Sequence, residues 1–160
     1  MNVRVGFGFD VHQLKENHPF FLGGVKLDHT KGAYGHSDAD VLIHAICDAL
    51  LGAAGLKDIG YYFPNTDARY KNIDSKKLLL EVVDKILEKG YLIGNVDATV
   101  TLEKPKLSPH VDEMKQILSE CMQVSSDCVS IKATTNEKLG YVGREEGVNA
   151  QAVALIYTLK

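Results

Sequence analysis

The sequence predicts an α/β fold: a single-domain α/β sandwich over residues 1–160, in which helices cover one face of a mixed β-sheet. Strand-like and helix-like segments are mixed along the chain, which is typical of helices packed against a sheet. The 160 residues are 45% hydrophobic and 24% charged, enough to build a core without disulfide bonds. From Ala152 onward the last strand is apolar on both faces. The helices cover one face, so we expect partner subunits of a homo-oligomer to pack against the other.

The first strand is expected over residues 3–12, where apolar residues occupy every second position. Its other face carries two glycines followed by two polar side chains, at Gly6, Gly8, Asp10 and His12. The third glycine of a dinucleotide-binding fingerprint is missing and no helix follows, which excludes that motif. The two glycines instead let another group approach the backbone closely, as in a crowded ligand site.

Turn residues, helix caps and hydrophobic periodicity predict the remaining elements in order. They are a hairpin over 20–28, a helix over 37–54, a long loop over 57–73, a helix over 75–89, a strand over 95–103, a helix from Ser108 onward, a strand over 129–134, a polar loop over 135–147 and a strand over 148–159. Ser37 or Asp38 is expected to cap the first helix, and Asp74 or Ser75 the second. Pro109 stands in the first turn of the third helix, where proline is favoured.

The charge and cysteine content narrow the classes of partner. The net charge is −3, the isoelectric point is near 6.0 and no basic block stands out, so we expect no nucleic-acid partner. Three cysteines without a C-x-x-C pair favour a reducing compartment. No apolar run approaches the roughly 20 residues that span a bilayer, and a strand pattern stands where a signal peptide would be. We therefore expect no membrane partner and a cytoplasmic location, or an organelle once an import segment has been removed.

A line of three ionisable residues runs along the otherwise apolar first helix, at Asp40, His44 and Asp48. Buried charges need partners, and Asp10 and His12 supply them if the first strand runs beside this helix. Asp10, His12 and His44 then offer three ligands with an open fourth position, the pattern of a catalytic zinc site. Asp48 or Asp40 would not bind the metal itself but would hold the ring of His44 in its orientation. The alternative is that these are surface or hydrogen-bonded residues without a metal.

A second group of candidate ligands follows the strand after the third helix, in the segment ATTNEKLGYVGR. The hydroxyls of Thr134 and Thr135 and the neighbouring backbone N–H groups suit phosphate oxygens. The carboxylate of Glu137 suits Mg²⁺ or Mn²⁺, and Lys138 and Arg144 add charged contacts. A solvated turn with capping threonines is the alternative interpretation.

Five stretches also carry a resemblance: GFGFDVH (6–12), GHSDADVLIHAICDALLGAAGLKDIGYYFPNTD (35–67), GNVDATV (94–100), KPKLSPH (104–110) and IKATTNEKLGYVGREEG (131–147). In order and spacing they resemble the 2-C-methyl-D-erythritol 2,4-cyclodiphosphate synthase family over nearly the whole chain. The resemblance implies a phosphorus–oxygen lyase of non-mevalonate isoprenoid biosynthesis. In its reaction the 2-phosphate of 4-diphosphocytidyl-2-C-methyl-D-erythritol 2-phosphate attacks the β-phosphorus, which releases CMP and leaves a cyclic diphosphate. It also implies a homotrimer with active sites between adjacent subunits.

The resemblance assigns roles to residues of this chain. Asp10, His12 and His44 would be zinc ligands, and Glu137 would bind a second cation, Mg²⁺ or Mn²⁺. His36 and Ser37 would contact the 2-phosphate of the substrate, and Asp58 and Gly60 its erythritol part. Thr134 and Thr135 would contact the diphosphate, and Lys106, in the loop 102–108 of the neighbouring subunit, the cytidine. Arg144 would be a further substrate contact.

Three positions depart from the family's pattern: Ala39, where glycine is frequent, Asn65, where aspartate is frequent, and Gln151, where some members have glutamate. Gln151 is expected near the trimer axis, so binding of an isoprenoid diphosphate in a central cavity stays open, although Arg144 is retained. Two alternative functions also stay open. One is a metal-dependent phosphohydrolase of nucleotide diphosphates, in which water is the attacking group, and the other is a non-catalytic trimer that binds a metal or an isoprenoid.

Overall fold

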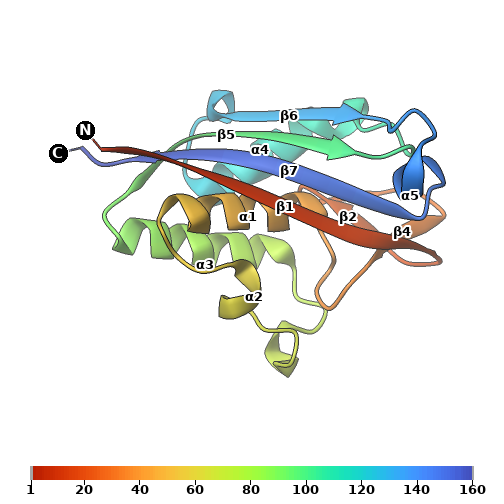
Figure 1. Ribbon diagram of the computed structural model, residues 1–160, viewed down its shortest axis with the longest axis horizontal. Coiled ribbons are helices and arrows are strands. Elements are labelled where there is room, and N and C mark those ends of the chain that lie inside the picture. Colours follow the sequence, from red (N-terminus) through yellow and green to blue (C-terminus); the bar gives the residue numbers. More distant parts are fainter. Residues whose placement is uncertain (1, 160) are drawn as a thin grey trace.

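A five-stranded mixed sheet forms the frame of the protein (Figure 1). The structure is a computed structural model that describes residues 2–159. The strands are ordered β4, β1, β7, β5 and β6; β5 and β6 run parallel, and the other neighbouring pairs are antiparallel. Their bounds are β1 (Val3–Glu16), β4 (Lys31–Tyr34), β5 (Leu92–Thr101), β6 (Val129–Thr134) and β7 (Gly147–Tyr157), and a separate hairpin is formed by β2 (Phe20–Leu22) and β3 (Val25–Leu27).

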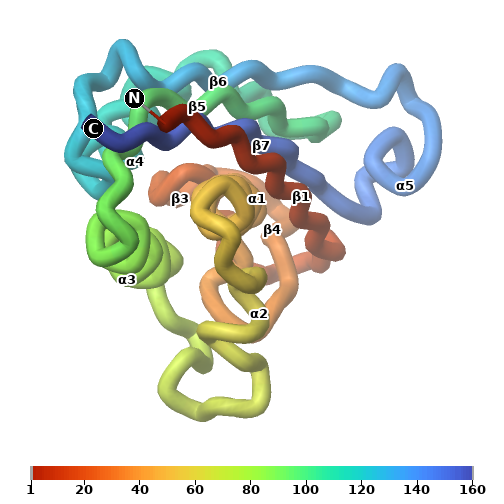
Figure 2. The backbone as a smooth tube through the Cα atoms, turned by 60° about the vertical axis from the view of Figure 1, so that its left-hand side comes forward, coloured from red at the N-terminus to blue at the C-terminus, as the bar shows by residue number. Residues whose placement is uncertain are grey.

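Three longer helices lie on one face of this sheet, as Figures 1 and 2 show. They are α1 (Val41–Ala53), α3 (Ser75–Glu88) and α4 (Val111–Met122). The connections contain short turns of helix, namely α2 (Ile59–Tyr62), α5 (Gly140–Gly143) and 3₁₀ turns at Ala68–Tyr70 and Ser126–Cys128. The helix predicted from Ser108 onward starts as a 3₁₀ turn at Ser108–His110 and becomes α4 at Val111. The predicted fold class, an α/β sandwich with helices on one face of a mixed sheet, is confirmed. No helix in the described part of the chain combines the length and apolar character needed to cross a membrane.

The start of α1 differs from its prediction. The helix begins at Val41, and its cap is Asp40, whose side chain accepts a hydrogen bond from the backbone N–H of Ile43 at 3.0 Å. Neither Ser37 nor Asp38 caps it: the Ser37 hydroxyl lies beside the ring of His44, and Asp38 accepts hydrogen bonds from Ser75. The second helix agrees with its prediction: Asp74 caps α3.

The buried carboxylate of Asp40 also joins α1 to the β2–β3 hairpin. It accepts backbone N–H hydrogen bonds from Gly23 at 2.9 Å and from Gly24 at 2.7 Å. Complete burial raises the pKa of Asp40, and the backbone hydrogen bonds oppose that rise. Asp40 is therefore used for structure and is not free to act on His44.

The first helix lies directly against the backbone of β1. A Cβ atom at Gly6 would lie 2.0 Å from the carbonyl oxygen of Ala49, and one at Gly8 would lie 1.9 Å from that of Ala45. No side chain fits there, so both glycines are required for the helix to approach the strand. The close approach expected from the sequence is real, but the approaching group is helix α1 and not a ligand.

The opposite face of the sheet carries an exposed apolar stripe, which we define as Val3, Val5, Phe7, Phe9 and Val11 of β1 together with Val153 of β7. These side chains are 42–63% exposed. Apolar area gathered in this way on a folded chain marks a surface that is covered by another molecule. The stripe lies on the face of the sheet that no helix among residues 2–159 covers.

Candidate active site

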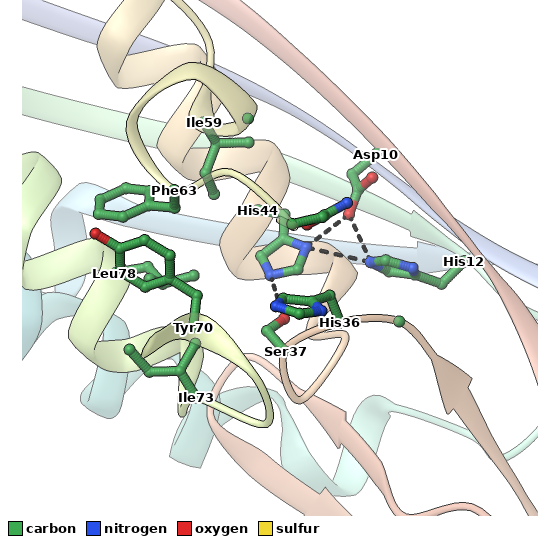
Figure 3. Close-up of a pocket in the computed structure, with 13 residues that line it drawn as sticks. Asp10, His12, His36, Ser37, His44, Ile59, Phe63, Tyr70, Ile73 and Leu78 are labelled. Atoms are coloured by element: carbon green, nitrogen blue, oxygen red, sulfur yellow. Dashed lines mark hydrogen bonds and ion pairs between the residues drawn. The ribbon is translucent and has the colours of Figure 1, made fainter. Parts of the chain in front are cut away.

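A pocket of about 340 Å³ opens between β1, the start of α1 and the loop that carries α2 (Figure 3). Polar side chains predicted for the site form one wall, and apolar side chains form the other. The pocket is lined by Asp10, His12, His36, Ser37, His44 and Gly60 among the predicted residues, and by Ile59, Phe63, Tyr70, Ile73 and Leu78 on the apolar side.

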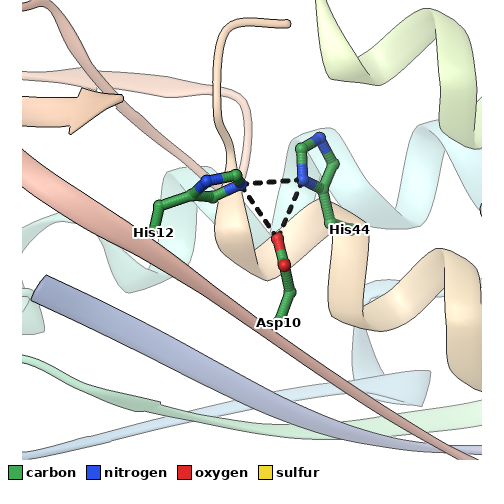
Figure 4. Close-up of side chains that lie close together, drawn as sticks. All are labelled: Asp10, His12 and His44. Carbon is green, nitrogen blue, oxygen red and sulfur yellow. Dashed lines mark hydrogen bonds and ion pairs between the residues drawn. The ribbon is translucent and has the colours of Figure 1, made fainter. Parts of the chain in front are cut away.

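Three of these side chains converge on one point (Figure 4). Asp10 and His12 extend from β1 on the face toward the helices, and His44 extends from α1, which the glycines of β1 hold close. The Asp10 Oδ2 atom lies 3.0 Å from His12 Nε2 and 2.9 Å from His44 Nδ1, and the two nitrogens are 3.2 Å apart. The predicted triad is thus assembled from two elements that are far apart in the sequence.

The triad fits a divalent cation. Ligand atoms that bind one tetrahedral zinc at about 2.0–2.1 Å lie about 3.3 Å from one another. The three atoms here are separated by 2.9–3.2 Å, so a small outward movement accommodates the ion. One carboxylate and two imidazoles make a donor set that zinc accepts, and the three groups leave a fourth position open toward the pocket.

The electrostatics of the triad keep the carboxylate ionised. Burial by itself raises the pKa of Asp10, but hydrogen bonds from His12 and His44 outweigh burial and place that pKa well below its ordinary value. Burial by itself lowers the pKa of His44, and the hydrogen bond to Asp10 outweighs it, so the net shift is upward. The three groups hold one another in the arrangement that a cation requires.

The second ring nitrogen of His44 faces away from the triad. His44 Nε2 lies 2.9 Å from the hydroxyl oxygen of Ser75 and 3.2 Å from that of Ser37. Ser75 is the first residue of α3, and the sequence marked it only as a possible helix cap. No local pattern connects it to His44, which lies 31 positions earlier.

Neither Asp48 nor Asp40, the residues predicted to orient His44, makes a hydrogen bond to its ring; the ring's Nε2 contacts Ser75 and Ser37. Asp48 accepts a hydrogen bond from the backbone N–H of Ile59 at 2.7 Å and so fixes the start of α2. Asp58 caps α2 by accepting from Tyr61 N at 2.9 Å, which places it beside Ile59 and Gly60 at the pocket.

The remaining predicted residues gather elsewhere. Lys106, Thr134 and Thr135 line a second pocket of about 180 Å³ at the ends of β5 and β6. Glu137 lies in the turn that follows, and its Oε1 accepts a hydrogen bond from Thr135 Oγ1 at 3.3 Å. Arg144 follows α5 and forms an ion pair with Glu146 at 2.9 Å.

The two groups of residues are separated by three strand spacings. In the register of the sheet Val11 lies opposite Asn149, Asn149 opposite Thr101, and Thr101 opposite Thr134. Neighbouring strands are about 4.8 Å apart, which puts Thr134 about 14 Å from the strand that carries the triad. One copy of the chain does not bring the predicted site residues into a single constellation.

A buried glutamate that the sequence did not indicate holds the turn with Glu137. Glu103 accepts hydrogen bonds from Lys138 Nζ at 2.7 Å, from Asn136 N at 3.0 Å and from Lys138 N at 3.3 Å. The hydrogen bond from Lys138 lowers the pKa of Glu103 below its ordinary range. Glu137 and Lys138 have φ angles of 51° and 64°, a conformation that needs such external support.

Comparison with known proteins identifies the family of this chain. The profile of the YgbB family matches residues 3–157. The 2-C-methyl-D-erythritol 2,4-cyclodiphosphate synthase of Cytophaga hutchinsonii is 64% identical over 156 residues, which cover 98% of each chain. The structure of Plasmodium falciparum IspF in its CDP complex superposes with a TM-score of 0.88 at 33% identity, covering 99% of this chain and 98% of that one.

A longer relative contains the same fold as one part. The bifunctional IspDF of Campylobacter jejuni superposes with a TM-score of 0.95 at 40% identity, over 99% of this chain and 43% of that chain. This chain thus spans less than half of that relative, whereas it spans 98% of the Cytophaga hutchinsonii synthase. On the family match, the full-length identity and the shared fold, the chain belongs to the YgbB family, that of the 2-C-methyl-D-erythritol 2,4-cyclodiphosphate synthases.

Proposed function

We propose that this chain is a phosphorus–oxygen lyase that converts 4-diphosphocytidyl-2-C-methyl-D-erythritol 2-phosphate into 2-C-methyl-D-erythritol 2,4-cyclodiphosphate and CMP, in isoprenoid precursor biosynthesis. One observation carries the proposal. The triad of Asp10, His12 and His44, with spacings of 2.9–3.2 Å, opens onto a pocket lined by His36 and Ser37. The chain that holds it is 64% identical to a synthase of that name.

In the reaction an oxygen of the 2-phosphate forms a bond to the β-phosphorus, and the bond from that phosphorus to the oxygen shared with the α-phosphate breaks. Asp10, His12 and His44 would hold Zn²⁺, and Glu137 would hold Mg²⁺ or Mn²⁺ together with the substrate's own phosphates. Bound there, the two cations offset the repulsion between the phosphates and the charge of the transition state. Both reacting groups belong to one molecule, so holding its two ends makes the attack a well-oriented intramolecular event.

The residues beside the triad are suited to hold the 2-phosphate end. The hydroxyl oxygen of Ser37 accepts a hydrogen bond from Ala39 N at 3.1 Å, which leaves its proton free for a phosphate oxygen. The ring of His36 lies against the same pocket, with its Nε2 3.3 Å from the carbonyl oxygen of Asp67. Asp58 uses one carboxylate oxygen as a helix cap and keeps the other for the erythritol hydroxyls.

The complete site requires a neighbouring subunit, and a homotrimer is the assembly we propose. Lys106, Thr134, Thr135 and Glu137 would contact the cytidine and diphosphate, yet their group lies about 14 Å from the strand that carries the triad. A substrate that touches both groups must therefore lie between two copies of the chain. The exposed apolar stripe of β1 and β7 supplies the surface that such copies bury.

Phe7→Asp is expected to prevent this assembly, because a carboxylate would then be desolvated without a partner in the apolar contact. Phe7 is 63% exposed in the single chain, so the isolated subunit tolerates the change. Sedimentation velocity should show monomers in place of trimers, with an association at least roughly tenfold weaker and loss of turnover. Leu80→Asp is the matched control, since Leu80 is 44% exposed on α3, outside the stripe. An unchanged trimer in Phe7→Asp contradicts the assignment of this surface.

Glu103→Gln is expected to loosen the turn that carries Glu137. The substitution keeps the shape but weakens the hydrogen bonds that depend on a negative charge, from Asn136 N and from both nitrogens of Lys138. The Mg²⁺ concentration for half-maximal turnover should rise about 10- to 100-fold, as for other residues that orient a metal ligand. Glu120→Gln is the control, because Glu120 pairs only with Gln116 on the exposed side of α4. Unchanged Mg²⁺ dependence in Glu103→Gln refutes the supporting role.

Product analysis tests the proposed function itself. The purified protein is incubated with the cytidine-diphosphate substrate and Mg²⁺, with and without a chelator, and phosphorus NMR identifies the products. We expect CMP and a cyclic diphosphate, lost with the chelator and restored by added Zn²⁺. CMP with a linear product identifies a phosphohydrolase instead, and a zinc-loaded trimer without turnover identifies a binding protein.

A further inference from the structure

A chain of hydrogen bonds leads from the metal triad into the protein through Ser75 and Asp38. The Ser75 side chain is fully buried, and its hydroxyl oxygen lies 2.9 Å from His44 Nε2. The same hydroxyl makes a short hydrogen bond to Asp38 Oδ1, and the backbone N–H of Ser75 donates to Asp38 Oδ2 at 2.9 Å. Asp40 N also donates to Asp38 Oδ1, at 3.2 Å.

Counting the protons in this series of hydrogen bonds, from His44 through Ser75 to Asp38, fixes the direction of each one. Every partner of the Asp38 carboxylate is a donor: two backbone N–H groups and the Ser75 hydroxyl. A hydroxyl has one proton, and that of Ser75 is used toward Asp38. The 2.9 Å contact between Ser75 and His44 Nε2 is then a hydrogen bond only if Nε2 carries a proton and donates it.

The contact to Ser37 agrees with this direction. The Ser37 hydroxyl oxygen lies 3.2 Å from His44 Nε2 and can accept a share of the same N–H. If Ser37 donated to an unprotonated Nε2 instead, the closer contact to Ser75 would contain no proton. With a proton on Nε2, the contacts of that nitrogen to Ser75 and to Ser37 are both satisfied.

We propose that Ser75 and Asp38 are positioning residues for the metal site: they hold the proton of His44 on Nε2 and thereby reserve Nδ1 for the cation. The inference deepens the proposed function, on whose metal use it rests. Without a cation Nδ1 also donates a hydrogen bond to Asp10, at 2.9 Å. A cation that displaces this proton leaves a neutral ring whose one proton is on Nε2, so the lone pair of Nδ1 is directed at the ion. The half-buried carboxylate of Asp38 accepts the Ser75 proton and so makes the Ser75 oxygen a better acceptor than the hydroxyl of a serine alone.

The proposal is tested with zinc alone and needs no substrate. Ser75→Ala removes the hydroxyl while keeping the backbone N–H that binds Asp38. Zinc affinity, measured by competition with a chromogenic chelator at fixed pH, should fall about 10- to 100-fold. The Nε2–H resonance of His44 in the zinc-loaded protein, seen by proton NMR, should lose its protection from exchange with water. Ser119→Ala is the matched control, because Ser119 is also a buried helix serine and its hydroxyl donates to the Gln116 carbonyl at 2.9 Å.

Asp38→Asn is the second variant, of nearly unchanged size. The side-chain NH₂ group of this asparagine replaces one carboxylate oxygen, so it must face either the backbone N–H or the hydroxyl of Ser75. In the second case the serine proton turns toward His44 Nε2 and favours a proton on Nδ1, where it competes with the cation. We expect a loss of zinc affinity at least as large as in Ser75→Ala.

The outcomes separate this inference from the proposed function. Folded variants with unchanged zinc affinity and an unchanged His44 resonance overturn the inference and leave the synthase assignment intact. Weakened zinc binding in the two variants, together with an unsubstituted protein that forms no cyclic product, overturns the synthase assignment and supports the inference.

Discussion

Replacing His44 by alanine is expected to lower kcat/KM for CMP release at least about 10³-fold, the equivalent of about 4 kcal/mol of transition-state stabilisation. The substitution removes one of the three groups that converge within 2.9–3.2 Å and leaves Asp10 and His12, which are too few to retain zinc at a catalytic site. Steady-state kinetics measure kcat/KM, and metal analysis of the purified protein measures its zinc content. Both kcat/KM and zinc content should fall.

The proposed trimer should persist in His44→Ala, because His44 faces the pocket and not the apolar stripe. Sedimentation and circular dichroism check that the fold is retained. His29→Ala is the control, since that ring contacts only Thr30 and Lys31 by hydrogen bonds and lies outside both pockets of the site. A folded variant with near-normal turnover removes His44 from the metal site.

Gly8→Ala is expected to lower the free energy of unfolding by about 3 kcal/mol or more, at the upper end of the cost of overpacking. The new methyl group would lie 1.9 Å from the carbonyl oxygen of Ala45 and 2.7 Å from the nitrogen of Ala49. Both are backbone atoms of α1, so no side chain can turn away and the helix must move off the strand. Because that helix carries His44 and the strand carries Asp10, zinc affinity should fall as well.

Urea denaturation and zinc competition measure the two effects of Gly8→Ala. Gly52→Ala is the matched control: Gly52 lies on the same helix, and a Cβ there would meet only the carbonyl oxygen of Phe7, at 4.0 Å. That change should leave zinc binding unaltered and stabilise the protein by up to about 1 kcal/mol, because alanine favours helix over glycine. Equal stability of the Gly8→Ala and wild-type proteins would contradict the direct contact of helix and strand.

Elements with strong local signals were predictable from the sequence. The strand over 129–134 has the predicted bounds, and the hairpin at Gly23 and Gly24 and the capped helix α3 are also confirmed. Strand β4 was missed, because its four residues Lys31–Tyr34 contain glycine and alanine and show no alternation. The start of α1 was placed too early, because Asp38, a good local cap, is used by Ser75 from another helix.

The metal triad could be predicted because charged side chains on an apolar helix require partners, and the strand offered two. The residues behind it could not. Asp38 and Ser75 are 37 positions apart, and each already had a sufficient local explanation as a helix cap. Glu103 was equally hidden, since only the folded turn brings the backbone of Asn136 and Lys138 to its carboxylate.

The resemblance leads us to expect glycine at position 39, and the backbone there offers a structural reason. Ala39 has a φ of 58°, in the left-handed region that costs a residue with a side chain roughly 1 kcal/mol. The departure is tolerated because the fold fixes this position between Ser37 and the cap Asp40. The sequence alone showed the departure but not its cost.

The place of β7 in the sheet determines when folding can finish. The last strand of the chain lies between β1 and β5 and pairs with both, and Val3 is aligned with Tyr157. The pairing of β1 with β7 closes a loop that contains almost the whole sequence. The chain in this loop loses conformational entropy before the contacts between the two strands can stabilise it. During synthesis the first strand therefore has its main partner only after the ribosome has released the last one. Until then β1 lacks the strand that pairs with it from Val3 to Gln13, and its apolar residues stay exposed in the nascent chain.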